Sequence, residues 1–147
     1  MKIKQISVFI ENVSGRLYEV TSSLGKAGIN IRAASLADTA EFGVLRMIVS
    51  DVAAARRIMM ERHLPARIDD VVAAEIEDSP GSLARLLKPV LDARVNSIYM
   101  YAFTGFTSGR AVMVFRFSDN DQAIRIMKEN GVQLLSPKDF GVIQSGQ

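Results

Sequence analysis

Two stretches of eight residues decide how this chain folds: IEDSPGSL at residues 76–83 and IENVSGRL at residues 10–17. Each stretch follows an apolar segment, contains one glycine, and leads into apolar residues at helical spacing. Each therefore predicts a strand, a tight loop and a helix in that order. Because the same succession occurs twice, at an offset of 66 residues, the chain is a duplication.

The duplication extends well beyond these two stretches. At the same offset, residues 10–30 lie over 76–96 with six identities, and at an offset of 68, residues 50–61 lie over 118–129 with seven. Ordinary composition would give about two identities over such a length. The change of offset places a small insertion between residues 96 and 118. A repeat of this length has the size of a small domain, so we expect one repeat over residues 1–70 and a second over 71–147.

Composition narrows the possible functions. The 147 residues carry a net charge of only +2, which is not the basic footprint of a nucleic-acid-binding domain. The chain has no cysteine, so disulfides and thiolate chemistry are excluded, and a cytoplasmic location is expected. No long apolar segment follows the N-terminus, and no run approaches the 18 apolar residues of a membrane span, so neither a signal peptide nor a membrane partner is expected.

The first repeat predicts six elements. Strands are expected at 3–10, 29–36, 44–49 and 68–72, and helices at 17–27 and 51–63. Ser14 and Asp51 are the expected N-caps of the two helices, because their side chains can accept hydrogen bonds from first-turn N–H groups. Gly28 is expected just past the end of the first helix.

The second repeat predicts the same order. Strands are expected at 72–76, 95–103, 111–117 and 132–135, with helices at 80–91, Pro80 at its first position, and at 119–130. Each repeat is therefore βαββαβ, the ferredoxin-like unit, with an antiparallel four-stranded sheet and both helices on one face. The predicted fold class is α+β, with two such units in tandem.

These loops resemble those of the ACT domain family, in which an Asn/Asp-x-Pro-Gly-x-Leu motif joins the first strand to the first helix. Residues 78–83 fit this motif fully, and residues 12–17 fit it with Ser14 in place of proline. The resemblance covers the chain twice and is closest to stand-alone proteins of two tandem ACT repeats. It implies a regulatory protein that binds a free amino acid at interfaces between ACT units. We also expect a homodimer, because each unit carries a sheet with open edges and a large apolar face. A partner enzyme is expected to respond to the change that the ligand makes in the packing of the units.

The loop chemistry agrees with this expectation. A helix N-terminus presents unpaired N–H groups that suit a carboxylate, and a glycine allows the ligand to approach the backbone. Asn12 and Asp78 could accept a hydrogen bond from an α-ammonium group. The expected ligand-binding residues are Asn12, Val13, Ser14, Gly15, Arg16, Leu17, Asn30, Asp78, Ser79, Pro80, Gly81, Ser82, Leu83 and Asn96. The alternative is that Asn12, Ser14, Asp78 and Ser79 only cap helices.

Catalysis is not expected. The sequence shows no nucleophile–base set, no phosphate-binding loop and no metal-spaced cluster, so no catalytic residue, cofactor or metal is predicted. The alternative to an amino-acid-binding protein is an interaction module without a ligand. Such a module would resemble the regulatory small subunit of acetolactate synthase.

Overall fold

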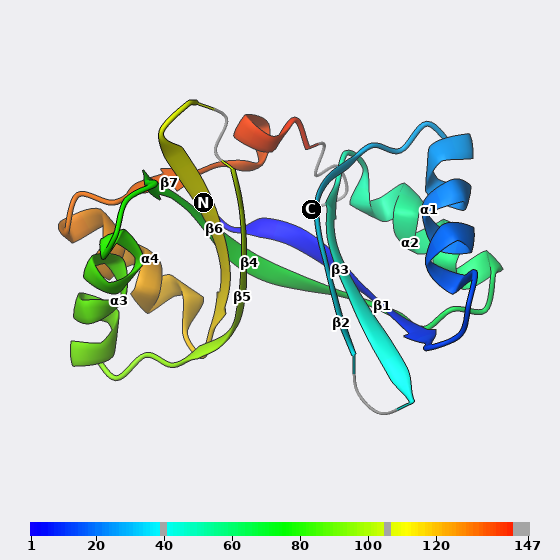
Figure 1. Cartoon of the computed structure of the whole chain (residues 1–147), viewed down its shortest axis with the longest axis horizontal. Helices are drawn as coiled ribbons and strands as arrows, with labels where there is room; N and C mark the ends of the chain where they lie inside the picture. The colour runs from blue at the N-terminus through cyan, green and yellow to red at the C-terminus, as the bar shows by residue number, and fades with distance from the viewer. Residues whose placement is uncertain (39–40, 105–106, 143–147) are drawn as a thin grey trace. The chain divides into compact units, whose positions relative to one another are not determined.

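The computed structural model describes residues 1–38, 41–104 and 107–142 (Figure 1). The chain forms two compact units. The N-terminal unit contains Lys4–Asp69 and the chain from Pro137 onward, and the C-terminal unit contains Met1–Ile3 and Asp70–Ser136. The repeat boundary between residues 70 and 71 remains a prediction.

The N-terminal unit has a ferredoxin-like arrangement. Its elements are β1 (Ile3–Glu11), α1 (Arg16–Lys26), β2 (Ile31–Asp38), β3 (Phe42–Val49), α2 (Val52–Glu61) and the beginning of β4 (Ala66–Glu77). The strands lie in the order β2-β3-β1-β4, with β3 antiparallel to both β1 and β2. Figure 1 shows α1 and α2 together on one side of these strands.

The C-terminal unit repeats the arrangement. Its elements are the remainder of β4, α3 (Ser82–Asp92), β5 (Ser97–Thr104), β6 (Arg110–Phe117), α4 (Asn120–Glu129) and β7 (Gln133–Leu135). The strands lie in the order β7-β4-β6-β5, and each neighbouring pair is antiparallel. The predicted α+β class with two ferredoxin-like units is confirmed.

Each unit has its own apolar core, and the two cores are built from corresponding elements. In the N-terminal unit alternate residues of β1, including Ile6 and Val8, pack against Leu24 of α1 and Met59 of α2. In the C-terminal unit Val72 and Ala74 of β4 pack against Leu86 of α3 and Met127 of α4. Alternate strand residues thus pack against helix residues that recur at helical spacing, as the sequence pattern predicts.

Three sequence-based expectations on the elements need correction. The separate strands expected at 68–72 and 72–76 are one continuous strand, β4, because no turn residue interrupts Ala66–Glu77. The connection between the strands expected at 29–36 and 44–49 is shorter, since β2 reaches Asp38 and β3 begins at Phe42. The end of the chain, for which no structure was predicted, forms a 3-10 helix at Pro137–Phe140.

Candidate functional site

Each glycine loop ends in a glycine that caps a helix. Gly15 precedes α1 with φ 90° and ψ −13°, and Gly81 precedes α3 with φ 85° and ψ −7°. Glycine adopts this left-handed backbone conformation readily, whereas residues with a Cβ adopt it only at a cost in free energy. Ser14 is therefore not an N-cap, and Pro80 lies before the cap rather than at the first helical position. Both expectations were wrong by one or two residues.

The caps of α1 and α3 lack a side-chain acceptor. Neither Gly15 nor Gly81 is accompanied by a side-chain hydrogen bond to the first turn. In α2 and α4, by contrast, Asp51 accepts from the Ala54 N–H at 3.1 Å and Asp119 accepts from the Gln122 N–H at 3.0 Å. The interpretation of Asn12, Ser14, Asp78 and Ser79 as simple caps is wrong. The first N–H of each helix donates to a loop carbonyl, Arg16 to Val13 at 3.4 Å and Ser82 to Ser79 at 3.2 Å, and the N–H groups that follow have no capping side chain.

The N-terminal loop borders a small hollow. The Asn12 N–H donates to the Glu41 carbonyl at 3.2 Å, and the Val13 N–H donates to the Glu11 carbonyl at 2.8 Å, so the loop backbone is held at both residues. The hollow has a volume of about 150 Å³. It is lined by Ile10, Glu11, Asn12, Val13, Gly15, Arg16, Leu17, Leu36, Asp38 and Gly43.

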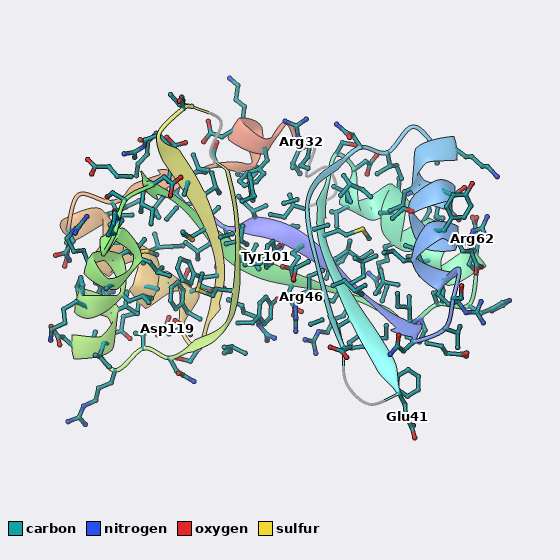
Figure 2. All side chains as sticks on the ribbon, viewed as in Figure 1. Arg32, Glu41, Arg46, Arg62, Tyr101 and Asp119 are labelled. Atoms are coloured by element: carbon teal, nitrogen blue, oxygen red, sulfur yellow. The ribbon has the colours of Figure 1, made fainter. Side chains whose placement is uncertain are left out.

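Charges next to the N-terminal loop are paired. Arg16 contacts Glu19 at 3.1 Å and Glu11 at 3.8 Å. Glu19 in turn contacts Arg62 at 3.6 Å, and Figure 2 shows Arg62 beside α1. These four side chains therefore form one chain of ion pairs that leaves none of their charges without a counter-charge.

The C-terminal loop borders a larger hollow of about 410 Å³. The Asp78 N–H donates to the Gly109 carbonyl at 2.9 Å, which holds the loop against the start of β6. Ser79 and Ser82 are joined through their hydroxyls at 2.7 Å. Residues lining the hollow are Ile76, Glu77, Asp78, Ser79, Gly81, Ser82, Leu83, Ala84, Leu87, Ala111 and Met113.

A second hollow of about 460 Å³ lies beside the same loop, and we call it the arginine hollow. Ile76, Glu77 and Ser82 line both hollows, so the two adjoin at these residues. Arg85 donates to the Ser82 hydroxyl at 3.0 Å, and Arg110 donates to the Glu75 carboxylate at 3.2 Å. The other lining residues are Leu86, Asn130, Gly131, Val132 and Gln133.

Sequence analysis did not single out Arg85 or Arg110. One signal could have found Arg85: at the offset of 66 it lies over Glu19, a reversal of charge four residues after the loop glycine. Arg110 lies over Phe42 at the offset of 68, which is also a change from apolar to charged.

Asn30 and Asn96 do not join the loops. Each follows the C-terminal end of its helix, an 11-residue segment that rises about 16 Å, whereas the loops lie at the N-terminal ends. The Asn30 N–H donates to the Ser50 hydroxyl at 2.9 Å, and the Asn96 N–H donates to the Ser118 hydroxyl at 3.0 Å. These bonds hold the backbone at the entry to β2 and β5, and a binding role for the two side chains stays a prediction.

The remaining loop positions lie at the surface. Val13 and Leu17 are partly exposed beside Gly15, and Ser14 and Pro80 are exposed on their loops. Leu83 is half-buried and packs against the C-terminal core. The structure thus gathers residues 12–17 at one helix end and residues 78–83 at the other.

Neither a metal site nor a membrane span is found in the described part of the chain. Within residues 1–38, 41–104 and 107–142, no group of three or more His, Asp or Glu residues could hold a metal ion. No helix in these segments is long and apolar enough to cross a bilayer.

Comparison with known proteins identifies relatives of the whole chain. The family model described as an ACT domain pair matches residues 1–143. The crystal structure of protein BT0572 from Bacteroides thetaiotaomicron is 40% identical, with a TM-score of 0.90 over 97% of this chain and 98% of that one. No curated protein matches the sequence.

More distant solved structures share the fold. The regulatory subunit of aspartate kinase from Thermus thermophilus, in its ligand-free form, is 16% identical, with a TM-score of 0.64 over 86% of this chain and 91% of that one. The same subunit from Thermus flavus is 16% identical, with a TM-score of 0.58 over 86% and 90%. At this identity the likeness concerns the fold alone.

Proposed function

Because the chain belongs to the ACT domain pair family, we propose that it is a non-enzymatic regulatory protein whose glycine loops bind a free amino acid. Ligand binding would favour one packing state of the protein over another, and a partner enzyme would respond to that change. The expected location is the cytoplasm.

The observation that carries this proposal is the pair of left-handed glycine caps. Both leave first-turn N–H groups without a side-chain acceptor, although the same chain caps α2 and α4 with aspartate. A ligand carboxylate can accept hydrogen bonds from such N–H groups and also interacts favourably with the positive end of the helix dipole. The N-termini of α2 and α4 are capped by an aspartate side chain. Those of α1 and α3 have no such side chain, and each of these two has a hollow beside it.

The hollows and nearby polar groups suit a small zwitterion. Asn12 and Asp78 each line the hollow at their own loop and could accept from an α-ammonium group. The hollow of about 410 Å³ at the C-terminal loop falls in the usual size range of small-molecule pockets, about 300–1,000 Å³. The hollow of about 150 Å³ at the N-terminal loop is below that range, so a site there requires additional walls.

A second copy of the chain could supply such walls. Tyr18 on α1 is 76% exposed, and Leu36 on β2 is 51% exposed, beside an apolar hollow of about 490 Å³. β2 is the last strand in the order of its unit, and an unpaired strand edge readily accepts another strand. We therefore propose a homodimer in which ACT units of two copies pack together and complete the ligand sites.

The same apolar surface supports the alternative function. A module that only binds another protein, as a small regulatory subunit does, would use exposed residues such as Leu17 and Phe42 and would need no ligand. The two proposals differ in whether an amino acid stabilises the fold.

A thermal-shift screen of the twenty amino acids on the full chain separates them. A ligand that binds only the folded protein raises its stability by RT ln(1 + [L]/Kd), so one or a few amino acids should raise Tm in a concentration-dependent way. If none does so at millimolar concentration, the interaction module is the better description. Sedimentation at micromolar concentration tests the homodimer, and a species of only 16.1 kDa would contradict it.

A further inference from the structure

The two repeats differ in how charges beside their loops are arranged. In the N-terminal unit, Glu19 lies between Arg16 and Arg62, at 3.1 and 3.6 Å, and Arg16 also contacts Glu11. The charges of this cluster are therefore compensated within the protein, and a charged ligand would have to compete with existing ion pairs.

In the C-terminal unit the aligned positions break this cluster. Arg85 replaces Glu19, Ser82 replaces Arg16, and Asn130 replaces Arg62. Among the described residues, Arg85 forms no ion pair with a carboxylate, and its one recorded partner is the neutral Ser82 hydroxyl. An exposed arginine without a counter-charge lies on the wall of the arginine hollow.

Two acids without an ion-pair partner among the described residues also line these hollows. Glu77 lines both hollows and Asp78 lines the loop hollow, and no ion pair involves either carboxylate within the described segments. Arg110 lies directly opposite Glu77 in the β4–β6 ladder, but its guanidinium donates to the side chain and the carbonyl of Glu75 instead, both at 3.2 Å. The C-terminal loop therefore has a cation and two acids that do not neutralise each other.

Arg85 is held close to the loop glycine. Its Nη2 donates to Ser82, whose hydroxyl is bonded to Ser79, so three side chains form a continuous link from the loop to the guanidinium. A Cβ added at Gly81 would lie 3.1 Å from Arg85 Nη1, whereas one added at Gly15 would meet nothing within 4 Å. The glycine at position 81 thus leaves space that the guanidinium uses.

We infer that the C-terminal loop is the principal amino-acid site of this protein and that Arg85 binds the ligand carboxylate, with Glu77 and Asp78 facing the ammonium group. This inference rests on the proposed function and adds to it the repeat, the orientation of the ligand and a binding residue outside the loop motif. A cation and two acids that are not paired with each other suit a zwitterion. The ligand carboxylate would pair with Arg85, and the ligand ammonium group would pair with Glu77 and Asp78. A simple anion would meet Arg85 but would also be repelled by the two acids.

Calorimetry and thermal shift on the full chain test the inference. The probes are the twenty L-amino acids and, for each that binds, its α-carboxamide and its N-acetyl derivative, at pH 6.5, where the ammonium group of the carboxamide stays protonated. The wild-type protein should bind the amino acid at least about tenfold more tightly than either derivative, as expected for a charge-assisted hydrogen bond. Arg85→Gln should weaken amino-acid binding about tenfold and reduce the preference over the carboxamide to about twofold.

Glu19→Gln is the matched control, since it removes a charge at the aligned position of the other repeat. It should leave both affinities within about twofold of wild type. If Arg85→Gln retains the preference for the carboxylate, or if Glu19→Gln has the larger effect, the inference is overturned while amino-acid binding stands. If no amino acid binds the wild-type chain, the proposed function itself fails.

Discussion

The two glycine loops have nearly the same backbone and different surroundings. Gly15 and Gly81 differ by only 5° in φ and 6° in ψ, yet Gly15 is followed by the ion-paired Arg16 and Glu19, and Gly81 by Ser82 and the unpaired Arg85. The backbone was therefore retained in both copies while the charges diverged. The comparison teaches that the shared positions maintain the fold, whereas the divergent ones give each loop its own arrangement of charges.

Other shared positions support this division. Ser50 and Ser118 both exchange two hydrogen bonds with the asparagine at the start of the neighbouring strand, at 2.8–2.9 Å and 2.8–3.0 Å. Asp51 and Asp119 both cap the next helix, and Figure 2 labels Asp119 near the start of α4. Identity between the repeats at these positions has a structural cause.

The largest expected effect concerns the paired cores. Met59 and Met127 are aligned, identical and fully buried. We expect Met59→Ala and Met127→Ala each to lower the free energy of unfolding by about 2–5 kcal/mol, because each removes buried methylene groups and leaves a cavity. Urea denaturation of both variants measures this. If one substitution has no effect, the two cores do not contribute equally and the structural equivalence fails.

The next effect concerns the glycines themselves. Gly15→Val and Gly81→Val each place a β-branched side chain at positive φ, which costs on the order of 1–3 kcal/mol. Only Gly81→Val also displaces Arg85, so we expect it to weaken amino-acid binding more than Gly15→Val does, while the dimer persists. Calorimetry and sedimentation of both variants check these outcomes. Wild-type binding by both would remove the loops from the site.

A smaller and equal effect is expected at the two aspartate caps. Asp51→Ala and Asp119→Ala each remove one side-chain acceptor for a first-turn N–H, which costs about 1 kcal/mol. Neither residue lines a loop hollow, so ligand affinity should stay unchanged. Thermal unfolding with and without the amino acid found by the screen measures both quantities, and a changed affinity would show that the caps and the loops are coupled.

The smallest effect is restricted to the C-terminal unit. Lys2 contacts Asp121 at 3.1 Å, and its hydrogen bond and charge interaction with Asp121 raise the pKa of Lys2 above the ordinary 10.5. The aligned residue in the N-terminal repeat is Ala53, which cannot form such a contact. The stabilisation is present below pH 10.5 and is lost as the pH rises through the raised pKa. Unfolding measured from pH 9 to 12 should therefore be less pH-dependent in Asp121→Asn, and an unchanged profile would exclude this contribution.

The fold followed from the sequence because its main signals are local. Alternating apolar residues in β1, the helical spacing in α2 and the acceptor side chain of Asp51 all act within a few residues. The wrong assignments, Ser14 and Pro80, arose where a glycine replaced the usual side-chain cap. A left-handed glycine cap carries no side-chain acceptor that a sequence pattern could reveal. The helix starts were therefore predicted one or two residues too early, at Ser14 and Pro80.

The site was predictable only in part. The loop motif indicated residues 12–17 and 78–83, which the structure gathers at two helix ends. Asn30 and Asn96 were included because the resemblance extends to them, but their hydrogen bonds join strand ends. Arg85, Arg110 and Asn130 line one hollow although they come from distant parts of the sequence, so the spacing of residues alone could not show this arrangement of charges.

The order of the segments within the N-terminal unit has a consequence for synthesis. The N-terminal unit contains the 3-10 helix Pro137–Phe140, in which Phe140 is completely buried, so this unit lacks that segment until it has been made. The segment follows Asp69 by about 70 residues, which at roughly 5–20 residues per second is a delay of about 4–14 s. The repeat that is translated first is therefore the one that must wait for a segment made after the second repeat.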